Sequence, residues 1–332
     1  MEYVIGIDGG GSKTACLIQP ICIDEQPLQA GSRWITVLEK GTNPLSVGFG
    51  PMRERISTLL QHAMQEAGVR PEDVRAVCAG LAGLQRDEDR LRVRMELHQL
   101  YMELGLADHA VITLTTDVHA ALRGALPPGE REGILVISGT GSNCIGRTDD
   151  GRIYRCGGWG HVLGDEGSGY RIGMMGLQAV CQAADARGEP TMLTAMAVDK
   201  WHLKSIRDLL PIVYAGNPDK RVIASFARET LVCAERFDAV AVRIVEEAAN
   251  DLVSHVRSLH LQSSRFSART TVTTGGSIFE HSPLLMRRFR EGIECGRLGV
   301  YRSGCGNAVE GAAVLAGESL DNNGMEESNL WP

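Results

Sequence analysis

The chain has 332 residues, which is enough for two domains that each bury a core of their own. Hydrophobic residues make up 43% and charged residues 23% of it, and the formal net charge of −7 argues against a nucleic-acid surface. No apolar run approaches the roughly 20 residues that a membrane span needs, and the N-terminus lacks the basic stretch of a signal peptide. We therefore expect a cytoplasmic protein that binds neither nucleic acid nor membrane.

The cysteines support the same expectation. There are nine of them, none forms a Cys-x-x-Cys pair, and Cys16, Cys78 and Cys144 lie within apolar, strand-like runs. An odd number of cysteines without metal-ligand spacing is typical of a reduced protein whose thiols pack as small apolar groups.

The first part of the chain alternates strand-like and helix-like segments. We expect strands at 4–7, 14–18, 28–38, 74–79 and 110–115, and helices at 52–67, 89–104 and 119–126. In the first of these helices the apolar residues recur at helical spacing, and Gly68 is a plausible stop signal. Residues 127–129 (PPG) punctuate the end of this part.

The second part begins in the same way and then diverges. We expect strands at 134–137, 143–146 and 270–274, and helices at 168–187, 240–261 and 307–316. The pattern predicts two α/β domains with mixed sheets, at 1–126 and 127–317, and a mobile acidic tail at 318–332.

Two short phrases, 130 residues apart, indicate that the two domains are copies of one unit. Residues 7–12 read IDGGGS, residues 137–142 read ISGTGS, and four of the six positions are identical. Each phrase lies between two strand-like runs, so each predicts the tip of a β-hairpin. A lone glycine turn of this kind is most often only a turn, but a repeated one favours a pair of cradles for phosphate oxygens. Neither phrase fits a Walker-type or dinucleotide-binding signature.

Three further features are expected to carry chemistry. A third glycine turn follows the strand that ends at Thr274, and Asp117 ends another strand, where it could act as a general base or cap the next helix. Residues 156–170 hold six glycines together with Trp159, Asp165 and Glu166. Such a segment favours close approach to a ligand, with sugar hydroxyls meeting the carboxylates, over a plain turn in which Asp165 caps the following helix.

Taken together, these motifs resemble those of the N-acetylglucosamine kinases in the BadF/BadG/BcrA/BcrD ATPase family of the sugar kinase, heat-shock and actin superfamily. The resemblance rests on residues 8–14, 115–117, 137–144, 156–161 and 164–168, in that order along the chain, and runs from Asp8 to about Ala316. It implies two ribonuclease-H-like, actin-like ATPase domains with ATP and a sugar in the cleft between them. It also implies an ATP:sugar 6-phosphotransferase.

The resemblance assigns a role to each motif. Asp117 would be the catalytic base, and Asp8 would hold Mg²⁺ through water. The phosphates of ATP would be bound by Gly10, Gly11, Ser12, Lys13, Thr14, Gly139, Thr140, Gly141 and Ser142. The adenosine side would be formed by Gly275, Gly276 and Ser277. The amino sugar would be bound by Asn43, Asp117, Gly158, Trp159 and Asp165.

Several alternatives stay open at this point. The preferred sugar is expected to be N-acetylglucosamine, with glucosamine and N-acetylmuramic acid as alternatives. An ATPase that activates a 2-hydroxyacyl-CoA dehydratase would need clustered cysteines, and a non-catalytic sugar sensor would not need Asp117. Lys13 is as readily a solvated turn lysine as a phosphate ligand. Relatives are often dimers, so a homodimer is expected by analogy alone.

Overall fold

The computed structural model describes residues 1–21, 34–38, 40–84, 86–106, 108, 110–214 and 220–321, which form two compact units. The first unit consists of Met1–Arg131 together with the chain from Gly304 onward, and the second is Glu132–Ser303. The expected domain boundary after residue 126 lies five residues before the boundary after Arg131. The expected second domain extends to residue 317, whereas residues 304–317 belong to the first unit.

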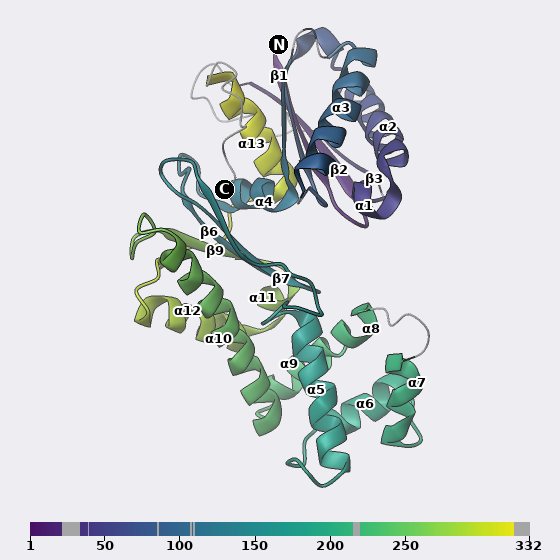
Figure 1. Cartoon of the computed structure of the whole chain (residues 1–332), viewed down its shortest axis with the longest axis vertical. Coiled ribbons are helices and arrows are strands. Elements are labelled where there is room, and N and C mark those ends of the chain that lie inside the picture. The colour runs from purple at the N-terminus through teal and green to yellow at the C-terminus, as the bar shows by residue number, and fades with distance from the viewer. Residues whose placement is uncertain are drawn as a thin grey trace. The chain divides into compact units, whose positions relative to one another are not determined.

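The first unit is built on a five-stranded sheet of order β3-β2-β1-β4-β5. Its strands are β1 (Tyr3–Gly9), β2 (Thr14–Pro20), β3 (Trp34–Leu38), β4 (Val74–Leu81) and β5 (Val111–Thr116). Its helices are α1 (Pro44–Val47), α2 (Phe49–Ala67), α3 (Asp87–Glu103), α4 (Asp117–Ala125) and α13 (Ala308–Asp321). Figure 1 shows α2 and α3 on one face of this sheet and α4 and α13 on the other.

The strand sequences explain the two faces. Along β1, Ile5 and Ile7 pack with α2, whereas Val4 packs with α4 and α13, as the period of two in a strand requires. Since both faces are covered by helices, β1 and β4 read as nearly continuous apolar runs.

The second unit repeats this topology with the order β10-β9-β6-β7-β8. Its strands are β6 (Gly133–Ser138), β7 (Ser142–Arg147), β8 (Ile153–Gly157), β9 (Thr271–Gly275) and β10 (Val300–Tyr301). In both units an antiparallel hairpin comes first, β1-β2 or β6-β7, and its first strand then pairs in parallel with a later one, β4 or β9. The duplication expected from the two glycine phrases is therefore present in the strand order as well.

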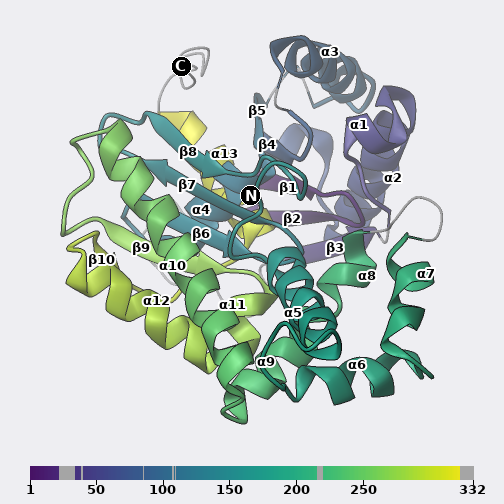
Figure 2. The same ribbon diagram turned by 60° about the horizontal axis from the view of Figure 1, so that its bottom comes forward.

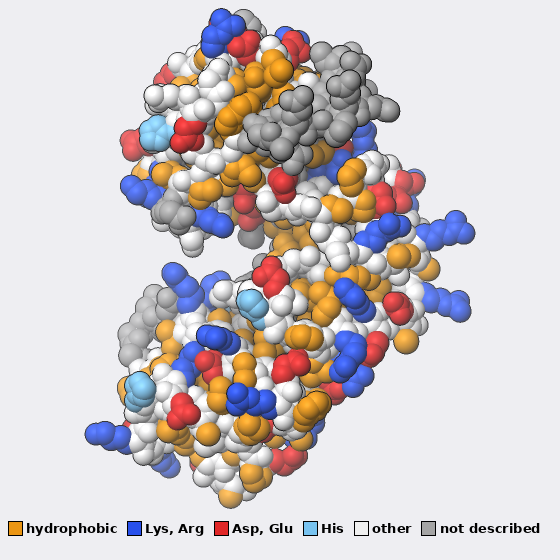
Figure 3. Space-filling view, turned by 180° about the vertical axis from the view of Figure 1, so that it is seen from behind, with side chains coloured by type: hydrophobic (Ala, Val, Ile, Leu, Met, Phe, Trp, Pro, Cys, Tyr) orange, Lys and Arg blue, Asp and Glu red, His pale blue; other side chains and the backbone are white. Residues whose placement is uncertain are grey.

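Helices cover one face of the second sheet, where Figure 2 shows α10 and α12 side by side. The helices of this unit are α5 (Gly169–Ala184), α6 (Leu193–Trp201), α7 (Leu209–Tyr214), α8 (Lys220–Ala224), α9 (Ala227–Glu235), α10 (Ala239–Gln262), α11 (Ser277–His281) and α12 (Pro283–Cys295). None of the helices within the described segments combines the length and apolar character needed to cross a lipid bilayer. On the face shown in Figure 3, basic and acidic side chains are interspersed over the surface of each unit.

The expected elements are present, with ends shifted by a few residues. Of the strand expected at 28–38, residues 34–38 form β3, and residues 28–33 lie outside the described residues. Residues 318–321, expected to begin a mobile tail, instead continue α13, and 322–332 lie outside the described residues. Glu318 accepts hydrogen bonds from the Arg123 guanidinium, with Nη2 at 2.9 Å, so the end of the helix is tied to α4.

The last helix can reach the first sheet only because the contact positions are glycines. A Cβ atom added at Gly311 would overlap the carbonyl oxygen of Ala120 on α4, and one added at Gly6 of β1 would overlap the backbone of Ala313 on α13. The helix therefore packs backbone to backbone against both elements.

A matched pair of substitutions tests this packing. Gly311→Ala should lower the free energy of unfolding by about 1–3 kcal/mol, because the new methyl group forces α4 and α13 apart. Gly317→Ala, on the same helix but with nothing within 4 Å of the new atom, should be neutral or stabilise by up to about 1 kcal/mol. Urea unfolding of both variants would measure this, and equal effects would contradict the close approach.

Candidate functional site

In the first unit, the candidate residues gather at the carboxyl ends of three parallel strands. Asp8 on β1 lies opposite Gly80 on β4, which lies opposite Thr115 on β5. Neighbouring strands are about 4.8 Å apart, so Asp8 and the end of β5 are separated by about 10 Å at the backbone. Asp117 follows β5 directly, and the strand between the two carboxylates carries a glycine there.

The two carboxylates influence one another. The pKa of Asp8 is raised to about 6, first because burial disfavours its charge and second because Asp117 is nearby, whereas the Lys13 ammonium acts in the opposite direction. Since a bound cation would relieve this repulsion, the pair fits a Mg²⁺ ion held by one or two carboxylates and several waters. No group of three or more potential ligand side chains is placed around one metal position in the described part of the chain.

Asp117 is the first residue of α4 and not its cap. The cap is Thr116, whose hydroxyl accepts a hydrogen bond from the His119 amide, whereas Asp117 Oδ1 accepts one from the Val118 amide at 2.9 Å. The Asp117 side chain therefore lies in the first turn of α4, at the carboxyl edge of the sheet.

The β1–β2 turn is held in place by the segment that precedes α1. The Gly10 amide donates to the Lys13 carbonyl at 3.1 Å, and the Thr42 amide donates to the Gly10 carbonyl at 3.0 Å. Thr14 is fully buried, and its hydroxyl donates to the Lys40 carbonyl at 2.9 Å. Gly10 and Thr14 therefore shape the turn with these groups, and Gly11, Ser12 and Lys13 form its exposed tip.

Asn43 lies next to this turn. Its side-chain oxygen caps α1 by accepting a hydrogen bond from the Leu45 amide at 2.9 Å. Gly83, just beyond β4, has a φ of +84°, and any side chain there would collide with that oxygen. The first unit thus brings Asp8, Asn43, Asp117 and the turn of residues 10–13 to one edge of its sheet.

In the second unit, the β6–β7 turn is enclosed by residues 165–170. Two serine hydroxyls of the turn are donors, from Ser138 to the Gly167 carbonyl and from Ser142 to the Glu166 carbonyl, each at 2.7 Å. In return the Gly169 amide donates to the Gly139 carbonyl at 2.8 Å. The Gly139 amide is engaged with the Gly141 carbonyl at 2.9 Å, so the turn is as closely bonded as its counterpart in the first unit.

Asp165 is directed at this turn. It is buried, its φ is +62°, and its Oδ1 accepts a hydrogen bond from the Ser142 amide at 3.3 Å. A left-handed conformation costs a non-glycine residue about 1 kcal/mol or more, so the surrounding bonds must hold it. The helix cap considered for Asp165 is supplied instead by Ser168, whose hydroxyl accepts from the Arg171 amide.

The third glycine turn lies beside the second. Ile137 of β6 is opposite Gly275 of β9, and Gly276 has a φ of +97°. A Cβ atom at Gly276 would overlap the Ser138 carbonyl. The turns expected to bind the phosphates and the adenosine side are thus in contact at the carboxyl edge of this sheet.

The segment that joins β8 to α5 is irregular, as its composition predicts. Its residues with positive φ are Gly157, Gly158, Gly160, Asp165 and Gly167. Trp159 is 75% exposed, so its ring is open to solvent within this unit.

The sequence reasoning missed Asn143. This residue lies on β7 beside Gly158, where an added Cβ atom would be 3.0 Å from Asn143 Nδ2. Its buried side-chain oxygen has no hydrogen-bond partner in the described part of the chain. An unsatisfied polar atom beside the segment expected to hold a sugar suggests a ligand contact. Its position directly after the second glycine phrase was the available signal.

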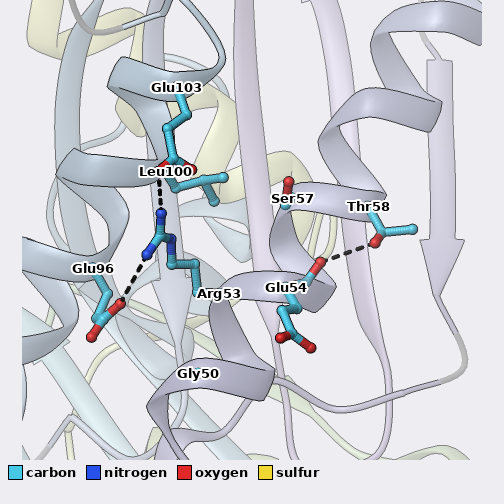
Figure 4. Close-up of a pocket in the computed structure, with 8 residues that line it drawn as sticks. All are labelled: Gly50, Arg53, Glu54, Ser57, Thr58, Glu96, Leu100 and Glu103. Atoms are coloured by element: carbon cyan, nitrogen blue, oxygen red, sulfur yellow. Dashed lines mark hydrogen bonds and ion pairs between the residues drawn. The ribbon is translucent and has the colours of Figure 1, made fainter.

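A cavity of about 460 Å³ lies away from these residues, between α2 and α3. Figure 4 shows Arg53 at its wall, paired with Glu103 at 2.6 Å and with Glu96 at 3.7 Å. Its guanidinium charge is thus already balanced, and none of the residues expected in the site lines this cavity.

The raised pKa of Asp8 predicts a stability cost that depends on pH. Above pH 6 the carboxylate is ionised in both the folded and the unfolded state, so the full cost is present; below pH 3.8 it is protonated in both, and the cost disappears. Asp8→Asn should therefore stabilise the protein at pH 8, in the presence of EDTA, by up to about 3 kcal/mol. The gain should shrink as the pH falls through 6 towards 4.

Urea titrations at several pH values would measure this dependence. Asp73→Asn, in the same unit, is the matched control of opposite sign, because Arg70 lowers the pKa of that carboxyl and the substitution should destabilise at neutral pH. A loss of stability in Asp8→Asn at pH 8 would contradict the electrostatic argument.

Comparison with known proteins gives consistent matches along nearly the whole chain. A kinase from Clostridium acetobutylicum, named N-acetylmuramic acid/N-acetylglucosamine kinase, is 36% identical over 296 residues, which are 88% of this chain and 90% of that protein. An N-acetyl-D-glucosamine kinase from Dictyostelium discoideum is 28% identical over 330 residues, which are 95% and 98% of the two chains.

Solved structures agree on the fold. A Chromobacterium violaceum protein described as an N-acetylglucosamine kinase has a TM-score of 0.66 at 25% identity and covers 95% of this chain and 99% of its own. A ROK-family glucokinase from Streptomyces griseus has a TM-score of 0.53 at 18% identity, with coverage of 95% and 99%. The expected two-domain fold of the actin-like ATPases and sugar kinases is therefore confirmed.

The family model for the BadF/BadG/BcrA/BcrD ATPase family matches residues 5–316. This match spans both glycine turns of the hairpins, Asp117, the irregular segment and most of α13. The chain belongs to the BadF/BadG/BcrA/BcrD ATPase family.

Proposed function

We propose that this protein is an ATP-dependent kinase that phosphorylates the 6-hydroxyl of an amino sugar, with N-acetylglucosamine as the first candidate. The observation that carries the proposal is the pair Asp8 and Asp117 at one sheet edge, beside a glycine turn of the kind that holds phosphates. The relatives named as amino-sugar kinases support the same reaction class.

In this proposal, Asp117 acts as the general base. Its carboxylate would accept the proton of the sugar hydroxyl as the oxygen attacks the γ-phosphoryl group. Two hydrogen bonds fix the first turn of α4: the His119 amide donates to the Thr116 hydroxyl, and the Val118 amide donates to Asp117 Oδ1. The Asp117 carboxylate therefore has a defined direction.

Asp8 would hold the metal, through water. A bound Mg²⁺ would supply positive charge that offsets the negative charge of the transferring phosphoryl group. Burial and the nearby Asp117 raise the pKa of Asp8, which means that they destabilise its carboxylate form. A bound cation would stabilise that form. The backbone of Gly11, Ser12, Thr140 and Gly141 would meet the phosphates, and Gly275 to Ser277 the adenosine side.

Each unit offers candidate contacts for the sugar. In the first unit Asn43 and Asp117 would contact its hydroxyls, and in the second Gly158, Trp159 and the newly identified Asn143 would do so. Asp165 remains a candidate for contact with the sugar, and its Oδ1 also accepts a hydrogen bond from the Ser142 amide. We propose that its first task is to hold the phosphate turn.

N-acetylmuramic acid is a second candidate substrate, because the 36% identical relative carries both sugars in its name. It differs from N-acetylglucosamine by a lactyl group at C3. Glucosamine is a third, since a 27% identical glucosamine kinase from Vibrio cholerae matches 78% of this chain.

The function is tested by measuring ADP release with a panel of these three sugars. We expect sugar-dependent ADP release with at least one of them, and transfer to the 6-oxygen seen as a phosphorus-coupled C6 signal by NMR. Sugar binding without any ADP release would favour a non-catalytic sensor, and ATP hydrolysis indifferent to all three sugars would overturn the proposal.

The base is tested by Asp117→Asn. Turnover should fall by about 10²–10⁴-fold, the usual contribution of a general base, whereas sugar binding is retained. Asp87→Asn is the matched control, because Asp87 is also the first residue of a helix, but its side chain is fully exposed and is paired with Arg90 at 3.6 Å. Near-normal turnover in Asp117→Asn would remove that residue from the role of base.

The wider setting stays a proposal as well. We propose a reducing, cytoplasmic location, which is supported by the free thiols of Cys16, Cys144, Cys156, Cys181, Cys233, Cys295 and Cys305. A homodimer is the expected assembly, and light scattering of the purified protein would test it.

A further inference from the structure

A buried histidine lies beneath the irregular segment of the second unit. His255, on α10, is only 6% exposed, and its Nε2 is 3.7 Å from a carboxylate oxygen of Glu166. Its Nδ1 is buried without a hydrogen-bond partner among the residues described. No step of the proposed reaction uses this side chain.

The histidine touches both ends of the segment. At the start, an added Cβ atom on Gly157 would be 3.2 Å from His255 Cε1, so the ring packs against the glycine backbone. At the other end, Glu166 faces the same ring. Residues 158–165 therefore form a loop whose two ends, Gly157 and Glu166, both contact the His255 side chain on α10.

The same face of α10 also contacts the segment at Gly167. A Cβ atom on Gly167 would overlap the side chain of Leu252 and would be 2.8 Å from the Ala248 carbonyl. Ala248, Leu252 and His255 follow at spacings of four and three residues, so they line one face of the helix. The segment has no regular hydrogen bonding of its own, and this face serves as its floor.

The charges around the ring favour a neutral histidine that can still attract Glu166. Burial lowers the pKa of His255, and the Glu166 carboxylate opposes that shift. On the same helix, Asp251 and Glu247 are one and two turns away, and the pKa of Asp251 is raised by burial first and then by Glu247 and Glu166. Arg171 on α5 counteracts this effect on Asp251.

Glu166 connects the histidine to the phosphate turn. Its backbone carbonyl accepts the Ser142 hydroxyl at 2.7 Å, and the preceding residue, Asp165, accepts the Ser142 amide. A contact that fixes Glu166 therefore also restricts the conformation of the segment that carries Gly158 and Trp159 and lies beside Asn143.

We infer that His255 is a positioning residue for sugar binding, which joins the two ends of segment 157–166 through Gly157 and Glu166. The inference rests on the proposed function for the identity of the ligand. It assigns His255 no contact with the sugar and no part in proton transfer. Its effect is the order of the loop that presents Gly158 and Trp159.

The test compares His255→Ala, His255→Gln and Glu166→Gln with the wild type. His255→Ala should raise the KM and the equilibrium Kd of the sugar about tenfold. The KM of ATP should change less, by under about threefold, because the Ser142 hydroxyl bonds to the backbone carbonyl of Glu166 and not to the side chain that faces His255. His255→Gln, whose amide can occupy the position of Nε2, should restore most of the affinity. In the double variant His255→Ala/Glu166→Gln the two losses should be clearly less than multiplicative, because both remove the same contact.

His260→Ala is the matched control on the same helix. Its Nε2 bonds to the Leu298 carbonyl at 2.9 Å, away from the segment, so this variant should keep the wild-type sugar affinity. Amide hydrogen exchange over residues 157–168 adds a readout that needs no activity: exchange should accelerate in His255→Ala and stay unchanged in His260→Ala.

The outcomes separate this inference from the proposed function. If the wild type binds and phosphorylates a sugar but His255→Ala has unchanged affinity and exchange, the inference is wrong and the function stands. If no amino sugar is bound or phosphorylated, the proposed function fails, and the exchange experiment alone decides whether His255 orders the segment. Equal loss in His255→Ala and His260→Ala would show general destabilisation and would overturn the positioning role.

Discussion

Two buried serine hydroxyls hold the β6–β7 turn of the second unit to the segment that joins β8 to α5. Ser138 and Ser142 each donate to a carbonyl of residues 166–167 at 2.7 Å, and each is almost completely removed from solvent. Such a bond contributes only about 1 kcal/mol net, but a buried carbonyl left unpaired costs about 1–3 kcal/mol. The conformation of the β6–β7 turn and the left-handed conformation of Asp165 depend on this pairing. The β6–β7 turn and residues 165–167 are therefore parts of one hydrogen-bonded structure.

The first unit depends on a different constraint, which is electrostatic. Asp8 and Asp117 are placed at the ends of strands two apart, in a partly buried position where two ionised carboxylates repel one another. A fold selected only for stability would replace one of them. The presence of both carboxylates is reasonable if a cation and a substrate hydroxyl lie between them for part of each catalytic cycle. The repulsion that destabilises the ligand-free protein is then relieved when the cation binds.

Most of the framework follows from patterns within short stretches of sequence. Strand and helix positions, the duplicated hairpins and the C′ glycine Gly68, which is left-handed at a φ of +64°, were predictable because each depends on neighbouring residues. The hydrogen bond that Asp165 accepts and the packing of His255 were not. The partners of a buried side chain are decided by packing between residues far apart in the sequence, as for Asp165 and Ser142, which are 23 positions apart. Helices α1, α6 to α9, α11 and α12 and strands β8 and β10 were likewise not predicted.

The placement of α13 sets an order for making the protein. The second unit is one continuous stretch, Glu132–Ser303, and every residue of it is synthesised before α13. The first unit, although its sheet is made first, lacks until then the helix that fits against Gly6 and Gly124. The α13-facing side of β1 and β4 is therefore without that helix for as long as the second unit is being synthesised. The N-terminal unit, with Asp8 and Asp117, is the last to be completed.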